Sequence, residues 1–90
     1  MSQAIMDPAA VRRFAEELKR FNQEVQDRMM LLQARFQALG DTWQDQEHAR
    51  FREEFQRTLR AVLKFVEVSN QHVPFLLRKA QRIEDYLAQR

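Results

Sequence analysis

Two histidines are the side chains with the clearest capacity for chemistry in this sequence. His48 and His72 are the only residues of a type that titrates near neutrality, and His is also a common metal ligand. They lie twenty-four residues apart on one predicted helix, too far to share a metal ion. A di-iron helical bundle would need Glu three residues before each His, where Asp45 and Ser69 stand instead. We therefore expect no metal site and interpret both histidines as capping or surface residues.

The remaining candidates for catalysis are hydroxyl groups, and none has a suitable neighbourhood. No arrangement of His and carboxylate that would activate a nucleophile surrounds Ser2, Thr42, Thr58 or Ser69. Cys is absent, which excludes a thiol nucleophile, a disulfide framework and a Cys-ligated zinc or iron–sulfur site. Gly40 is the only glycine, so a glycine-rich phosphate loop is excluded as well. We expect a protein that is not an enzyme, with no catalytic residue and no cofactor.

The charged residues are numerous but mixed in sign. Fifteen Lys and Arg against thirteen Asp and Glu give a net charge of +2 over 90 residues, a length that suits a single domain, 1–90. Interspersed signs of this kind are typical of a solvated helix face. The densest basic group is Arg78, Lys79 and Arg82, which is small for a nucleic-acid site. Nucleic-acid binding is therefore the least favoured of our hypotheses.

The sequence shows no sign of a membrane segment or a cleavable leader. Its first eight residues lack the basic start and the apolar stretch of a signal peptide. The longest aliphatic run, residues 29–32, is far shorter than the roughly 20 residues that span a bilayer. We expect a cytoplasmic protein that does not bind membranes and is not exported through a cleavable signal peptide.

Turn signals divide the chain into two long helices. Asp7 and Pro8 supply an N-cap and a first helical residue, and Gly40 ends the apolar periodicity that follows. Asp45 or Thr42 can cap a second helix. The prediction is an all-α fold with one helix over about 8–39, a turn over about 40–45 and a second helix over about 46–88. A short connection makes such helices antiparallel neighbours, so the unit is a helical hairpin.

An apolar stripe with spacings of three and four residues runs along each predicted helix. On the first it consists of Val11, Phe14, Leu18, Phe21, Val25, Met29, Leu32, Phe36 and Leu39. On the second it consists of Phe51, Phe55, Leu59, Val62, Val66, Ser69, Val73, Leu76, Ala80, Ile83 and Leu87, with Ser69 as a tolerated polar residue. Pro74 leaves this register intact, so we predict a kink near Asn70–Pro74 rather than a break into a third helix.

Further apolar residues lie beside the stripes, more than a lone hairpin can cover. We expect a partner interface made by Met30, Leu31, Leu63, Phe65 and Val68, because large exposed apolar patches usually mark partner surfaces. Pairing of two hairpins into a four-helix bundle would bury them. The partner is then a second copy or a related hairpin.

The predicted turn carries the segment Trp43-Gln44-Asp45, with Phe51 early in the second helix. We expect the indole of Trp43 to pack the two helix ends together at the tip. A single Trp at this place, in a hairpin of this length without Cys, resembles the WXG family of small helical-hairpin proteins linked to type VII secretion. The resemblance covers nearly the whole chain.

Two positions differ from the family pattern. Asp45 stands where the motif has Gly, which makes the chain a divergent member with Trp-x-Asp. The family's C-terminal export motif is Tyr followed four residues later by Asp or Glu; Tyr86 is a candidate for this recognition, and Arg90 occupies the acidic position. The resemblance implies export without a cleavable signal peptide, whereas Arg90 argues against that route.

Two functions follow. The first is a non-enzymatic, dimerising hairpin that serves as a secretion-associated substrate or as an escort of a larger partner. The alternative is an intracellular helical adaptor that is not exported.

Overall fold

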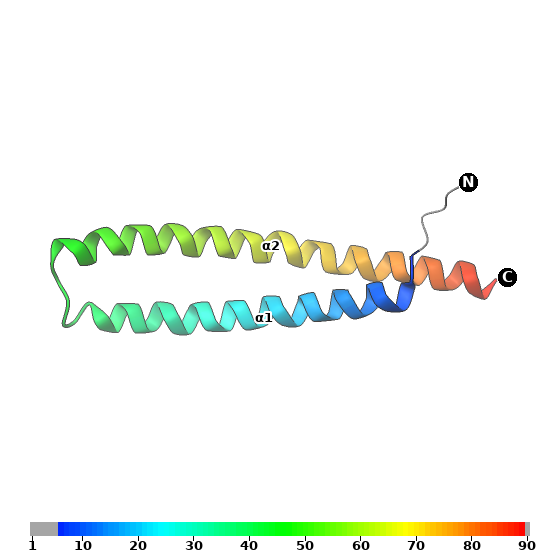
Figure 1. The fold of residues 1–90 in the computed structure, drawn as a ribbon, viewed down its shortest axis with the longest axis horizontal. Coiled ribbons are helices and arrows are strands. Elements are labelled where there is room, and N and C mark those ends of the chain that lie inside the picture. Colours follow the sequence, from blue (N-terminus) through cyan, green and yellow to red (C-terminus); the bar gives the residue numbers. More distant parts are fainter. Residues whose placement is uncertain (1–5, 90) are drawn as a thin grey trace.

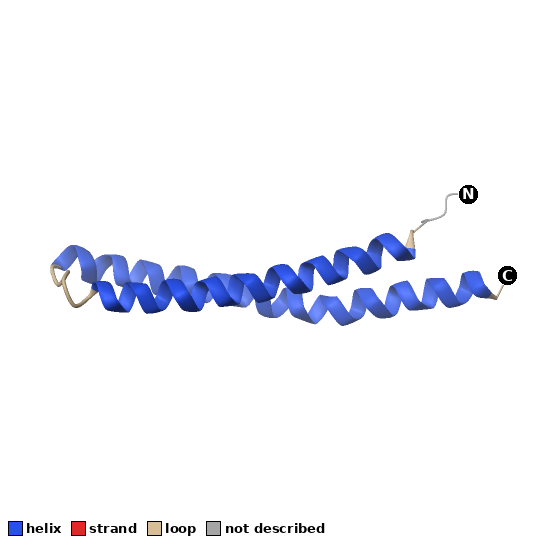
Figure 2. Cartoon of the chain, turned by 90° about the horizontal axis from the view of Figure 1, so that it is seen from below, coloured by secondary structure: helices blue, strands red, loops and turns tan. Residues whose placement is uncertain are grey.

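The computed structural model describes residues 6–89 and consists of one helical hairpin. Helix α1 spans Pro8–Leu39, helix α2 spans Gln46–Ala88, and the two run antiparallel with both termini at one end (Figure 1). Seen from the side, the helices cross at a shallow angle (Figure 2). The hairpin measures 68 × 24 × 14 Å, and the predicted two-helix fold is confirmed.

Side-chain caps fix where each helix begins. The Asp7 carboxylate accepts a hydrogen bond from the Ala9 amide at 3.0 Å, and Pro8 occupies the first helical position. The Asp45 carboxylate accepts one from the His48 amide, also at 3.0 Å. Each cap satisfies an amide that has no partner within its own helix, which is why the helices start at these residues.

Gly40 closes α1 in a right-handed conformation, with φ of −61°. Its amide donates to the Gln37 carbonyl oxygen at 3.1 Å. A Cβ atom at this position would lie 3.2 Å from that oxygen, tighter than ordinary contact. Glycine suits this position because it has no Cβ atom to crowd that oxygen. Its ability to adopt a left-handed backbone conformation is not used here.

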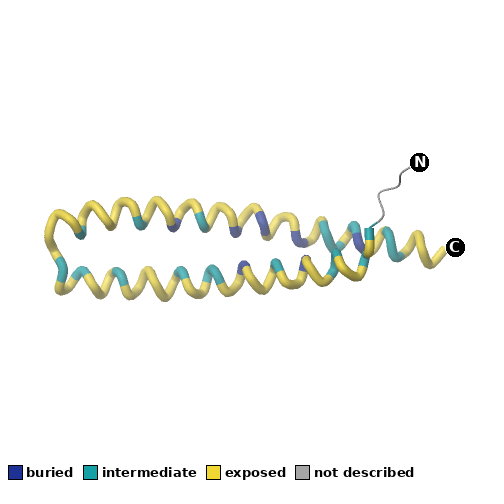
Figure 3. The backbone as a smooth tube through the Cα atoms, in the orientation of Figure 1, coloured by how far each residue is buried: buried dark blue, intermediate teal, exposed yellow. Residues whose placement is uncertain are grey.

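The buried positions of α2 follow the predicted stripe. Leu59, Val66, Ser69, Val73 and Ala80 are buried on the side that faces α1 (Figure 3). They all belong to the strict alternation of four and three residues that begins at Phe55, so this part of the prediction is confirmed.

The predicted stripe of α1 is wrong in part. Ala15 and Asn22 are buried at 0% and 1% exposure, whereas Phe14 and Phe21 beside them are 56% and 52% exposed. Leu32 and Leu39 are also exposed, at 53% and 45%. The observed and the predicted stripe share Val11, Leu18, Val25, Met29 and Phe36, so the spacing rule fits both. Hydrophobicity alone would place the phenylalanines in the interface between the helices. The fully buried positions there are instead Ala15 of α1 and Ala80 of α2, which let the backbones approach closely. Bulky rings do not fit in such a contact.

A layer of polar side chains lies in the middle of the interface. The Asn22 side-chain amide donates to the Ser69 hydroxyl oxygen at 3.0 Å and to the Asn70 side-chain oxygen at 2.9 Å. These bonds pair the amide nitrogen of Asn22, whereas its buried Oδ1 atom has no hydrogen-bond partner among residues 6–89. Ser69, expected as a tolerated polar residue, is thus one acceptor of a buried hydrogen bond.

Helix α2 continues through Pro74 as one element of 43 residues (Figure 1). A break into a third helix is therefore excluded for residues 6–89, while the expected bend at Asn70–Pro74 stays a prediction. Because Pro has no amide hydrogen, the carbonyl of Asn70, four residues earlier, lacks its usual helical donor.

We expect Asn22→Ala to lower the free energy of unfolding by about 2 kcal/mol, because it removes one buried and one partly buried hydrogen bond and leaves the buried Ser69 hydroxyl without its donor. Urea unfolding followed by circular dichroism measures the change. Arg20→Ala, an exposed change on the same helix, is the control and should stay within about 0.5 kcal/mol of the parent. Equal stabilities for the two variants would contradict the assigned role of the polar layer.

Candidate interaction sites

The tip of the hairpin is held by a cluster of five rings from three segments. Phe36 of α1 stacks on His48 of α2 with ring centres 5.0 Å apart, and it contacts Phe55 at 4.9 Å and Phe51 at 5.6 Å. Trp43 of the turn meets the His48 ring edge-on at 5.0 Å. These contacts join both helix ends to the turn, so the tip is a packed structure.

The turn itself needs no unusual backbone. Asp45 has φ of −100° and ψ of −176°, an extended conformation that any residue adopts, and its carboxylate caps α2. The Trp43 amide donates to the Leu39 carbonyl at 3.0 Å, which closes the end of α1. No residue from 6 to 89 has positive φ, so Asp at the third motif position causes no strain. The structure brings the predicted motif residues Trp43, Asp45 and Phe51 to the same end of the hairpin.

His48 has a larger role at the tip than the sequence suggested. Its ring is partly buried between Phe36 and Trp43, and its Nε2 atom is shielded from solvent with no hydrogen-bond partner among residues 6–89. Its spacing could have indicated this, because residues 48, 51 and 55 recur at three and four residues along one side of a helix.

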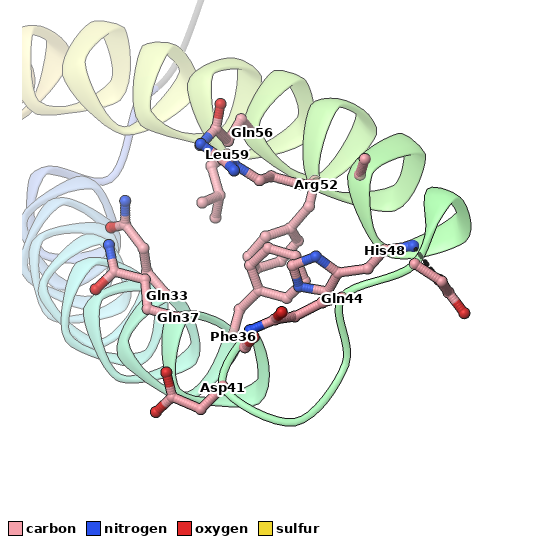
Figure 4. A pocket seen from close by; sticks show the side chains of 13 residues that line it. Gln33, Phe36, Gln37, Asp41, Gln44, His48, Arg52, Gln56 and Leu59 are labelled. Atoms are coloured by element: carbon pink, nitrogen blue, oxygen red, sulfur yellow. Dashed lines mark hydrogen bonds between the residues drawn. The ribbon is translucent and has the colours of Figure 1, made fainter.

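A cavity of about 520 Å³ opens below this cluster (Figure 4). Phe36, Phe55 and Leu59 supply its apolar wall. The polar residues around it include four glutamines, two Asp side chains and Arg52. Within residues 6–89, no group of three His, Asp or Glu side chains is placed to hold a metal ion.

A second surface is a broad apolar groove on one side of the hairpin. We call this side the aromatic face. Its cavity, about 850 Å³, is lined by Phe14 and Leu18 of α1 and by Phe65, Val68, Phe75 and Leu76 of α2, with His72 at its edge. Phe14, Phe65 and Phe75 are each half-exposed. Phe21 lies seven residues after Phe14, and so on the same side of α1.

The structure divides the predicted partner interface between two sides of the hairpin. Phe65 and Val68 line the aromatic face, whereas Met30 and Leu63 line a cavity on the opposite side. Leu31 follows Phe21 at spacings of three, four and three residues and so lies toward the aromatic face. The cause is helical geometry: residues 63 and 65 point about 200° apart at about 100° per residue.

The other predicted positions lie away from both sites. Tyr86 is 68% exposed near the end of α2, and Arg90 falls outside the described residues. Arg78 is an exception, because it lines the aromatic face, and with Arg82 and Phe75 it also lines a neighbouring hollow. At the open end of the hairpin, Arg12 forms an ion pair with Glu84 that joins the helices. Within residues 6–89, neither helix has the length and apolar character that crossing a bilayer requires.

We expect His48→Ala to lower the free energy of unfolding by roughly 1–3 kcal/mol, because it removes the ring that contacts both Phe36 and Trp43. Arg57→Ala, an exposed change on the same helix that lies outside the cavities described above, is the control and should change stability little. Thermal unfolding followed at 222 nm compares the two. If both variants unfold like the parent, the tip does not depend on the His48 ring.

Comparison with known proteins gives one match. The sequence model of the WXG100 family, described as proteins of 100 residues with WXG, matches residues 3–86. No curated protein and no solved structure gives a significant match. The match covers almost the entire chain, and it agrees with the two-helix hairpin and with Trp43 in its turn. The protein belongs to the WXG100 family.

Proposed function

We propose that the protein acts by pairing with a second hairpin through its aromatic face and that the pair is a substrate or an escort in type VII secretion. The family consists of small helical proteins associated with secretion, and its members pair as helical hairpins. The observation that carries the proposal is the groove lined by Phe14, Phe65, Val68 and Phe75.

Burial of these side chains supplies the driving force. Phe14, Phe21, Phe65 and Phe75 are each between 50% and 56% exposed in the single hairpin. Fully burying a side chain of this size contributes about 1.5–3 kcal/mol, and because these rings are already about half buried, pairing would contribute roughly half of that for each. Aromatic residues are also enriched at the centres of protein interfaces. A second hairpin laid on this face would complete a four-helix bundle.

The charges on α1 support a second copy of this chain as the partner. Along the side of Phe14 and Phe21, α1 carries Glu17 and Glu24 toward the open end and Arg28 and Arg35 toward the tip. None of these four forms an ion pair within residues 6–89. The pairs 17 with 35 and 24 with 28 share one midpoint, residue 26. If two copies of α1 lie antiparallel about that point, each acid faces a base of the partner.

The alternative function is an adaptor that docks on another protein and is not exported. The observation that favours it is Arg90, which stands where the family's export motif has an acidic residue. The two functions share the same docking surface and differ in whether the protein leaves the cell.

We expect Phe65→Glu to convert a dimer into a monomer, because it places a charge in the centre of the aromatic face. Leu63→Glu is the matched control, since Leu63 is similarly exposed and lies on the opposite side. Light scattering over a dilution series gives the mass of each. A dimer that survives Phe65→Glu would rule out the aromatic face as its interface. A parent chain that is monomeric at all concentrations would contradict self-pairing and point to a different hairpin as the partner.

A charge exchange tests the antiparallel arrangement. We expect Glu17→Arg to raise the dimer dissociation constant several-fold at low salt, because it places two like charges together at each end of the pair. The double variant Glu17→Arg with Arg35→Glu should restore it, since both contacts are then reversed. Residues 17 and 35 are about 27 Å apart along one helix, so they do not compensate within a single chain. If the double variant still dissociates as readily as Glu17→Arg at low salt, the antiparallel register about residue 26 is contradicted.

A further inference from the structure

The side of the hairpin opposite the aromatic face carries a continuous trough. The tip cavity and the cavity that contains Met30 share Gln33, Gln56 and Leu59 in their walls. That second cavity and a third, which reaches Asn70 and Pro74, share Gln23 and Gln26. The three hollows therefore adjoin one another from the tip to the middle of the hairpin. We call this trough the amide groove.

Side-chain amides are the most frequent polar groups in the walls of the amide groove. Its lining includes Gln23, Gln26, Gln33, Gln37, Gln44, Gln56 and Asn70, whereas Gln71 is the one amide that lines the aromatic face. The side chains of Gln26, Gln33, Gln37 and Gln56 form no hydrogen bond with any group of residues 6–89. In Figure 4, Gln33 and Gln37 extend from α1 and Gln56 from α2 around the cavity. These groups are therefore free to bond to a ligand.

The chemistry of these amides selects the ligand. Each glutamine has two N–H donors and a carbonyl acceptor, so it can bond to both groups of a peptide unit. An extended chain offers such groups outward, whereas a helix has already paired its own. We propose that the amide groove binds an extended, uncharged polypeptide segment of a partner protein.

The floor and the rim of the groove fit such a segment. Met29, Met30, Leu59 and Leu63 form an apolar floor, and Met side chains adapt to varied shapes. The charged residues that line the three cavities are balanced in sign, with three acids and three bases: Asp27, Asp41, Asp45, Lys19, Arg52 and Arg60. At the tip end, His48 Nε2 is shielded and has no partner among residues 6–89. The stretch from Gln23 to Gln37 is about 21 Å long, which matches about six residues of extended chain.

This inference does not depend on pairing through the aromatic face, because the two surfaces lie on opposite sides of the hairpin. A paired hairpin would keep the amide groove open to a further protein. The two proposals can be tested independently. Pairing is measured by the mass of the protein in solution, and peptide binding by the signals of the glutamine side chains.

The test uses the full chain labelled with ¹⁵N and the hexapeptide acetyl-Ser-Leu-Ser-Leu-Ser-Leu-amide as the probe. We expect the side-chain amide signals of Gln33, Gln37 and Gln56 to shift during titration, while that of Gln71 stays fixed. The same peptide with alternate amide nitrogens methylated keeps its side chains but loses backbone donors, and it should not shift them. Equal shifts with both peptides, or none with either at millimolar concentration, would overturn the proposal.

Two variants assign the binding to the groove. Gln33→Ala with Gln56→Ala should weaken peptide binding about tenfold, because at least two hydrogen bonds are lost. Gln71→Ala should leave it unchanged. Alanine favours the helix at these exposed positions, so both proteins should fold, which circular dichroism checks. Equal affinity in the two variants would contradict binding at the amide groove.

Discussion

The buried hydrogen bonds of Asn22 are the constraint on which the rest of the hairpin depends. Asn22 is 1% exposed, and its amide has acceptors only where Ser69 and Asn70 lie opposite it. A slip of one turn would place this amide against apolar side chains and would break both bonds. One polar layer therefore sets the alignment of α1 on α2, as single buried polar residues do in coiled coils. That alignment buries Ala15 and turns Phe14 and Phe21 outward, which creates the aromatic face.

The two sides of the hairpin differ because the helices bring different flanks together. The aromatic face combines rings from both helices, and the amide groove combines glutamines over an apolar floor. A single-sided hairpin would have only one surface to offer. The proposed second hairpin and the proposed extended segment would therefore not compete for space.

The fold could be predicted from particular residues, and the sites only in part. Asp7, Pro8 and Asp45 mark the helix starts, because caps act locally and leave a local signal in the sequence. The alternation from Phe55 onward allows only one inward stripe on α2. On α1 two stripes share most of their members, and contacts with the other helix decide between them: the hydrogen bonds of Asn22 and the burial of Ala15. The stripe of α2 also fixes the side that faces α1, so the division of Leu63 from Phe65 could have been predicted from helical geometry. The burial of His48 could not, because it depends on a contact across the turn.

The six-residue connection between α1 and α2 also sets the order in which the hairpin closes. The ring pair of Phe36 and Phe55 joins positions nineteen residues apart, the Asn22–Ser69 bond spans 47, and the Arg12–Glu84 pair spans 72. The entropy lost on closing a loop grows with the length of the loop. The contact at the tip therefore costs the least conformational entropy to form from an unfolded chain. Each contact then shortens the loop that the next must close. Loop-closure entropy therefore favours contacts at the aromatic tip over those at the open end, where α2 projects past α1 (Figure 1).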